Sequence, residues 1–183
     1  MHLLSRPIRF AALAAATFAL TSCASMNVSS YLERENDFGR YRTYGWAPSE
    51  ALETGDPRLD NNPFFHGRVQ ADIEQQLATR GFEKMASGVP DVLVHYHASV
   101  NQRIDVNAVD RVNGYCDQSD GCRPYAYQAG TLLLDLVDTR TDRVVWRGWA
   151  EDSVDVIDNQ HLMEQQIDRA VARIVQRLPH RAL

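Results

Sequence analysis

Residues 130–151, GTLLLDLVDTRTDRVVWRGWAE, decide the fold of this chain. Two β-rich runs are separated by the four residues TRTD, which is the pattern of a β-hairpin. One face of the first predicted strand carries Leu132, Leu134 and Leu136, which indicates that this face is buried. The second predicted strand has a tryptophan on each face, Trp146 on one and Trp149 on the other. We expect Trp146 to lie in the core.

Three segments upstream of the hairpin also have the features of strands. Residues 26–32 are mildly apolar and β-branched, and residues 41–47, YRTYGWA, alternate along the chain. Turn-forming residues separate these two segments, and the polar residues 48–61 are typical of a loop. Residues 89–100, VPDVLVHYHASV, predict the third strand. Its two faces carry Val92, Val94, Tyr96 and Ala98 on one side and Leu93, His95, His97 and Ser99 on the other.

Two segments have the apolar spacing of helices. The first has Asn62 as its N-cap and Pro63 at its first helical position, and it ends before Gly81. Its apolar stripe consists of Phe65, Val69, Ile73 and Leu77, and Asp72, Glu74 and Arg80 are predicted to face water. The second helix covers residues 159–178 and ends at Pro179. Its apolar side consists of Met163, Ile167, Ala170, Val171, Ile174 and Leu178.

The predicted order of elements is β-β-α-β-β-β-α, with short turns between most strands. This order predicts an α+β fold, a single two-layer domain in which two helices pack on one face of a mixed or antiparallel sheet. The polar residues 101–128 show no clear periodicity, so we expect a long excursion from the domain there.

The first 22 residues have the pattern of a signal peptide, with two arginines, no acid and an apolar run. The run is about half the length of 20 residues that a membrane-spanning helix needs. Leu20-Thr21-Ser22-Cys23 resembles a bacterial lipobox, which implies cleavage before Cys23 and attachment of diacylglyceryl and acyl groups to it. Residues 23–25 are then an acylated tether, and residues 26–183 form the domain. The alternative is an unmodified Cys23 in an ordinary cleaved peptide.

The residues after Cys23 indicate the membrane in which such a lipoprotein resides. Ala24 and Ser25 follow it, and no Asp stands at the sorting position. By analogy with enterobacterial lipoproteins, this favours the outer membrane, and we expect the domain to face the periplasm. Exposure at the cell surface is the alternative.

Two cysteines remain once Cys23 is assigned to lipid. Cys116 and Cys122 form an even pair in an oxidising compartment, which predicts a disulfide. The spacer DQSDG is turn-rich and lets the two α-carbons approach to the separation of about 4.4 to 6.8 Å that a bridge requires. Free thiols or a metal site are the alternative, and a metal site would need further ligands that no other cysteine supplies.

The charge and the motifs exclude several classes of function. Loss of residues 1–22, which contain two arginines and no acid, changes the formal net charge from −5 to −7, and this argues against nucleic-acid binding. No nucleophile elbow, phosphate-binding loop or dinucleotide-binding motif is present. Asp138 and Asp142 flank the hairpin turn, where Asp is favoured for bonding to its own backbone. We therefore expect no enzyme activity, and no cofactor apart from the lipid on Cys23.

His95 and His97 are the low-probability metal candidates, because side chains two apart on a strand leave the same face and can supply two ligands to zinc. The sequence indicates no third ligand, so a metal-binding or enzymatic envelope protein is the alternative function. Tyrosine and tryptophan are enriched at binding hot spots. Tyr125 and Tyr127, beside the predicted disulfide, and Trp149 are therefore the candidate residues for binding an envelope protein.

Three stretches of the chain resemble the bacterial lipoprotein family called domain of unknown function 4136. These are FGRYRTYGWA at 38–47, RGFEKMASGVPDVLVHYHA at 80–98, and residues 130–151, in which Trp146-Arg147-Gly148 is the most specific part. The resemblance covers nearly all of the mature chain. It implies an envelope lipoprotein with a compact α/β domain and implies no catalytic residue. The cysteine-bearing segment 116–122 is not part of the family pattern.

Overall fold

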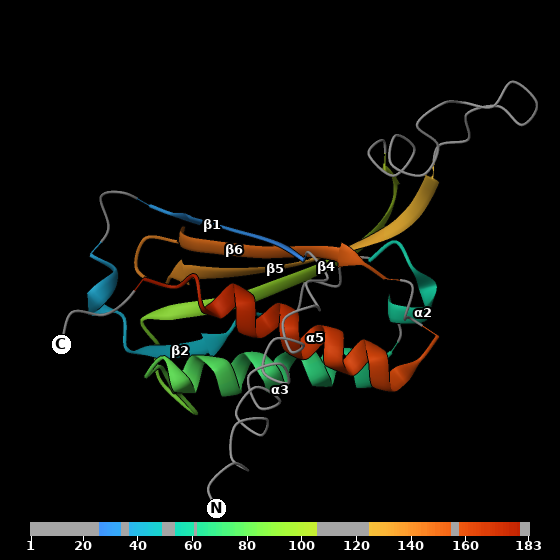
Figure 1. The fold of residues 1–183 in the computed structure, drawn as a ribbon. Helices are drawn as coiled ribbons and strands as arrows, with labels where there is room; N and C mark the ends of the chain where they lie inside the picture. The colour runs from blue at the N-terminus through green and yellow to red at the C-terminus, as the bar shows by residue number, and fades with distance from the viewer. Residues whose placement is uncertain are drawn as a thin grey trace, which may run out of the picture.

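The computed structural model describes residues 26–33, 37–48, 54–60, 62–105, 125–154 and 158–179. In this part of the chain, six strands form one mixed sheet in the order β1-β6-β5-β4-β2-β3. Helices α3 and α5 lie beside each other on one face of this sheet (Figure 1). The predicted α+β fold, with two helices on one face of a mixed sheet, is therefore confirmed.

The elements have the following bounds. The strands are β1 (Asn27–Leu32), β2 (Thr43–Trp46), β3 (Glu83–Lys84), β4 (Val92–Asp105), β5 (Tyr125–Asp138) and β6 (Arg143–Ser153). The helices are the 3-10 helix η1 (Phe38–Arg40), the single turn α2 (Pro57–Asp60), α3 (Pro63–Thr79) and α5 (Gln160–Val175). The sequence pattern did not predict η1, α2 or the two-residue strand β3.

The β5–β6 hairpin is the predicted one, with Thr139–Asp142 as its loop. The Asp138 carboxylate accepts hydrogen bonds from the backbone N–H groups of Arg140 at 2.7 Å and Thr141 at 3.3 Å. This contact confirms that Asp138 bonds to the backbone of its own turn. Asp142 closes the loop with a φ of 54°, a left-handed conformation that Asp tolerates better than most residues.

The residues of β6 do not alternate strictly between the two faces of the sheet, because the strand contains a β-bulge. Leu136 pairs with Trp146, but Val137 pairs with Val144, so Val145 is an extra residue in the ladder. Val145 and Trp146 are both buried as a result, whereas alternation placed them on opposite faces. The expected core position of Trp146 is confirmed.

Strands β4 and β5 are longer than predicted. They pair antiparallel from Val92 with Asp138 to Asp105 with Tyr125. The predicted excursion over 101–128 is therefore wrong at both of its ends, where residues 101–105 and 125–128 continue the two strands. Polar residues occur at these positions because the sheet extends there beyond the helices, and both of its faces can contact water (Figure 1).

The first two strands are not neighbours in the sheet. Strand β1 pairs antiparallel with β6 at one edge, and β2 pairs parallel with both β4 and β3 near the other edge. The chain between them therefore crosses from one side of the sheet to the other, and it includes the buried Phe38 of η1. Parallel pairing of β2 with β4 is possible because α3 connects them.

The cap and the apolar stripe of α3 are as predicted. The Asn62 side chain accepts hydrogen bonds from the N–H groups of Phe64 and Phe65, and Gly81 follows the helix with a φ of 75°. The predicted apolar residues of α3 and α5 are buried. Asp72 is a correction, because it was predicted to face water and is 8% exposed. It lies against α5, beside Arg68 of its own helix and Asp168 of α5.

Residues of the family pattern make the main contacts at one end of the domain. Around the β5–β6 turn, Asp138 is fully buried and accepts hydrogen bonds from Tyr41 Oη at 2.8 Å and from Arg40 at 2.6 Å. Burial by itself raises the pKa of Asp138, but the hydrogen bonds from Tyr41 and Arg140 outweigh it and hold that pKa below its usual range. We call this the hairpin end. At the opposite end α3 and α5 begin (Figure 1). We call it the pocket end, because an apolar pocket opens there.

Candidate functional site

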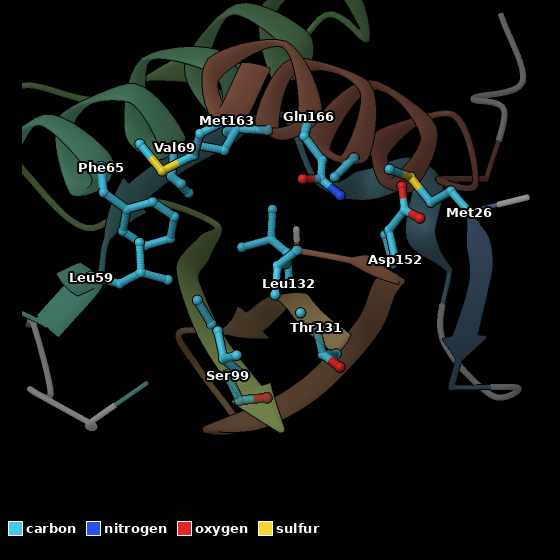
Figure 2. Close-up of a pocket in the computed structure, with 17 residues that line it drawn as sticks. Met26, Leu59, Phe65, Val69, Ser99, Thr131, Leu132, Asp152, Met163 and Gln166 are labelled. Carbon is cyan, nitrogen blue, oxygen red and sulfur yellow. The ribbon is translucent and has the colours of Figure 1, made fainter. Parts of the chain in front are cut away.

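An apolar pocket lies at the pocket end, between the sheet and the first turns of α3 and α5 (Figure 2). Phe65 and Val69 of α3, Met163 and Ile167 of α5 and Leu132 of β5 form much of its wall, with Leu59 of α2 at one side. Its volume is about 80 Å³, and it opens to solvent. An engineered apolar cavity of about 150 Å³ in another protein takes up benzene. The present pocket therefore has room for a small apolar group, such as one aliphatic side chain.

The pocket arises from the way in which the elements end. Helices α3 and α5 begin at this end with their caps, Asn62 and Asn159, and their first apolar residues reach the sheet only from Phe65 and Met163 onward. Small residues form the opposing strands, including Ala98, Gly130 and Ala150. Above Gly130 the space is taken by Val154, because a Cβ atom at this glycine would lie 2.3 Å from Cγ1 of Val154. The small side chains of Ala98 and Ala150 opposite the helix starts leave the rest of the space unfilled.

Met26 lies on the wall of this pocket, immediately before β1 (Figure 2). It stands three residues after Cys23 in the sequence. Three residues of extended chain span at most about 11 Å.

Two polar side chains face the pocket. Asp152 is on the helix-covered face at the end of β6, and Gln166 reaches towards the same side of the pocket from α5 (Figure 2). Both side chains are partly buried. Ser99 and Thr131 also line the space, but they belong to the opposite face of the sheet, and their hydroxyl groups point away from the helices in Figure 2.

The predicted metal candidates lie on the other, open face of the sheet. His95 pairs with Asp135 and His97 with Leu133 of β5, and both histidines are partly buried. His66 does not join them, because its Nδ1 lies 2.9 Å from Tyr96 Oη on the helix-covered face. Within the described ranges, no three His, Cys, Asp or Glu side chains are placed to hold a metal ion.

The structure does not bring the predicted partner-binding residues together. Trp149 pairs with Leu133, and Tyr127 with Arg103, on the open face. Six residues of strand separate Tyr127 from Leu133, a distance of roughly 20 Å. The side chain of Tyr125, and both Cys116 and Cys122, lie outside the described residues, as does Cys23. Their predicted roles as a binding residue, a disulfide and a lipid site stay predictions.

Sequence reasoning did not find the pocket. It correctly assigned Phe65, Val69, Met163 and Ile167 to buried stripes, but it gave no sign that these residues border an open space. Asp152 and Gln166 carried no signal either, because they belong to no motif.

None of the described helices is both long and apolar enough to cross a membrane.

The chain belongs to the family described as domain of unknown function (DUF4136), whose model matches residues 28–180. This match confirms the family resemblance, and it assigns no molecular activity. No curated protein matches the chain.

Two solved structures are similar to this chain, and the first shares its fold. A PDZ domain protein from Parabacteroides distasonis is 13% identical, with a TM-score of 0.55, and the match covers 86% of this chain and 37% of that one. The chain thus spans little more than a third of that protein. A PelC dodecamer structure from Paraburkholderia phytofirmans is 11% identical, with a TM-score of 0.48 over 86% of this chain and 99% of that chain. At these identities the likeness concerns the fold alone.

Proposed function

We propose that this protein is a lipid-anchored, non-catalytic binding module of the cell envelope, and that it binds an apolar group of another molecule in the pocket. The observation that carries the proposal is the open pocket itself. The pocket has a volume of about 80 Å³, and most of the side chains that line it are apolar. Apolar surface that stays exposed to water forgoes about 25 cal/mol per Å² that its burial would contribute. Binding of a ligand is the simplest reason to keep such a space.

The anchor supports an envelope location for this activity. Cys23 is the lipobox cysteine, and attachment of two or more acyl chains to it gives stable membrane binding. With Ala24 and Ser25 after it, we propose the outer membrane, with the domain in the periplasm. The pocket then opens close to the membrane surface, because Met26 lies on its wall. Palmitate labelling tests the anchor, and label that persists on a Cys23→Ser variant would contradict it.

The pocket is tested with a small neutral probe, n-pentanol, on the mature chain carrying Cys23→Ser. Saturable shifts of the backbone amide resonances of Leu132 and Ile167 are expected. The Ala98→Leu substitution adds an aliphatic side chain inside the pocket and should weaken binding at least tenfold. The matched control is His97→Leu, which places the same side chain on the opposite face of the same strand and should leave binding unchanged. Equal binding by both variants, or no saturable binding to the unsubstituted pocket, would refute the proposal.

The same pair of substitutions tests the pocket in cells. A photo-crosslinking amino acid at Leu162, which is 42% exposed and adjacent to Met163, lies near the pocket opening. A partner crosslinked there should be lost with Ala98→Leu and kept with His97→Leu. A crosslinked product that is unaffected by Ala98→Leu would show that the partner binds elsewhere.

A further inference from the structure

The polar atoms that face the pocket are hydrogen-bond acceptors. Asp152 Oδ1 accepts a hydrogen bond from its neighbour, the Ser153 N–H, at 2.9 Å, and within the described part of the chain Asp152 forms no ion pair. Gln166 donates its Nε2 group to the backbone carbonyl of Ser153 at 2.5 Å. Its Oε1 atom has no donor among the described residues. The pocket therefore offers a carboxylate and an amide oxygen to whatever enters it.

Among the described residues that line the pocket, the Gln166 Nε2 group is the side-chain donor on the helix-covered face, and it is bonded to the Ser153 carbonyl. The hydroxyl groups of Ser99 and Thr131 point away from the helices, and the other lining side chains apart from Asp152 are apolar (Figure 2). Arg173 Nη1 donates to the backbone carbonyl of Met26 at 3.5 Å. A ligand of this pocket must therefore bring the donors itself, next to the group that it inserts.

The charge of the site and the size of the pocket together identify a class of ligand. Resting on the proposed function, we infer that the pocket binds a protein segment that inserts one bulky aliphatic side chain and carries basic residues beside it. Asp152 and Gln166 accept hydrogen bonds from the ammonium, guanidinium or backbone N–H groups of that segment. The formal net charge of −7 on the chain without residues 1–22 attracts a basic segment over a longer range.

An anionic membrane lipid does not fit these features. Phosphate and carboxylate headgroups are acceptors and carry the same sign of charge as Asp152, so they would be repelled at the opening. An acyl chain already in the bilayer also gains little by moving from one apolar environment into another. A side chain that comes from water gains the full transfer free energy of its buried methyl and methylene groups. The occupant that gains from binding is therefore an apolar side chain in a basic segment.

Three acetylated and amidated tripeptides separate the two requirements. Lys-Leu-Lys should bind the mature chain carrying Cys23→Ser about tenfold more tightly than Lys-Ala-Lys, because the alanine leaves the pocket unfilled. It should also bind about tenfold more tightly than Glu-Leu-Glu, because the charge-assisted contact with Asp152 is partly exposed to solvent. Binding is measured from the amide resonances of Leu132 and Ile167, together with a thermal melt of each variant.

Two variants assign these preferences to their causes. Asp152→Asn should reduce the preference for Lys-Leu-Lys over Glu-Leu-Glu to the small part that the net charge of the chain contributes, and it should keep the preference for leucine over alanine. Ala98→Leu should remove the preference for leucine over alanine and keep the preference for Lys-Leu-Lys over Glu-Leu-Glu. Asp142→Asn makes the same change of charge at the hairpin end, where asparagine tolerates a φ of 54°, and it should alter neither preference.

Each remaining outcome decides against a separate claim. If Glu-Leu-Glu binds as tightly as Lys-Leu-Lys while leucine is still preferred to alanine, the inference about basic partners is wrong and the proposed function stands. If leucine is not preferred and n-pentanol does not bind, the proposed function fails. Binding to phosphatidylglycerol vesicles that competes with n-pentanol and is unaffected by Asp152→Asn would indicate a lipid ligand and overturn the inference.

Discussion

Replacement of Gly148 by alanine tests the packing that holds β6 against α5. Gly148 lies on the helix-covered face of β6 and is buried beside Trp146. A Cβ atom at Gly148 would lie 2.4 and 2.7 Å from two ring carbons of Trp146, and 2.8 Å from Cγ2 of Ile174 on α5. Carbon atoms in contact prefer about 3.5 to 4.0 Å. The indole ring or the helix must therefore move by about 1 Å.

The expected destabilisation follows from this overlap. Overpacking a closely packed core costs about 1 to 3 kcal/mol. Replacing glycine inside a strand regains roughly 0.5 to 1 kcal/mol of backbone entropy. Because all three contacts would be shorter than 3.0 Å, the overpacking cost lies in the upper part of its range, and a net loss of about 1 to 2 kcal/mol remains. For a domain of this size, 1 kcal/mol corresponds to roughly 2 to 4 °C. We expect the melting temperature to fall by about 2 to 8 °C, with a change in tryptophan fluorescence as Trp146 is displaced.

Gly67→Ala is the matched control for this substitution. Gly67 is exposed inside α3, and a Cβ atom there would meet nothing within 4 Å. The same chemical change should therefore raise the stability by about 0.5 to 1 kcal/mol, because alanine favours a helix interior over glycine. If Gly148→Ala matched or exceeded the unsubstituted protein while Gly67→Ala behaved as expected, the close contact between Gly148 and Trp146 would be refuted.

Two further predictions concern pH and the cysteines. Burial, and after it the hydrogen bond with Asp168, raises the pKa of Asp72 to about 6. The protonated form of Asp72 therefore contributes stability below about pH 4, and this contribution is lost as the pH rises through 6. Asp72→Asn should therefore be more stable than the unsubstituted chain by roughly 1 to 2 kcal/mol at pH 7.5 and should lose this advantage at pH 4. Urea denaturation at both pH values measures the difference in the free energy of unfolding. An equal difference at the two pH values would show that this reasoning is wrong. Cys116 and Cys122 should be bridged in protein from the periplasm, which mass spectrometry without reduction tests by counting free thiols. Because the ring contains only about seven residues, replacing both by serine should lower the melting temperature only modestly, and complete unfolding would contradict this.

Periodicity predicted the elements because burial on one face repeats along each element. The apolar stripe of α3, from Phe65 to Leu77, is buried as predicted, and so are Leu134 and Leu136 of β5. Leu132 lies on the same face but is only partly buried, because it lines the pocket. The order of strands in the sheet was not predictable in the same way. Nothing local in residues 26–32 indicates that they pair with β6 rather than with the strand that follows them in the sequence.

The errors have local physical causes. Alternation failed at Val145 because a bulge adds one residue to β6 and changes which side chains are buried beyond it. Asp72 was predicted to face water because a helical pattern does not show that a second helix, with Arg68 and Asp168 nearby, covers that position. The pocket was missed because its wall consists of apolar residues from separate elements, whose individual patterns are those of an ordinary core.

Several residues in the three stretches that carry the family resemblance are explained by packing. Tyr41 bonds to the buried Asp138, the indole N–H of Trp46 donates to Glu74 at 2.8 Å, and Gly148 leaves room for Trp146. These contacts lie at the hairpin end or along the middle of the sheet. The residues that give the pocket its chemistry, Asp152 and Gln166, belong to none of the three stretches that carry the resemblance.

This arrangement has a consequence for substitutions in this chain. Loss of a buried hydrogen bond or of the packed indole at the hairpin end or in the middle of the sheet should destabilise the domain. Asp152 borders an open space at the other end and is only partly buried, so its replacement should change the stability less. An Asp152→Lys variant should therefore stay folded and prefer Glu-Leu-Glu to Lys-Leu-Lys, and an unchanged preference would contradict the inferred role of this carboxylate.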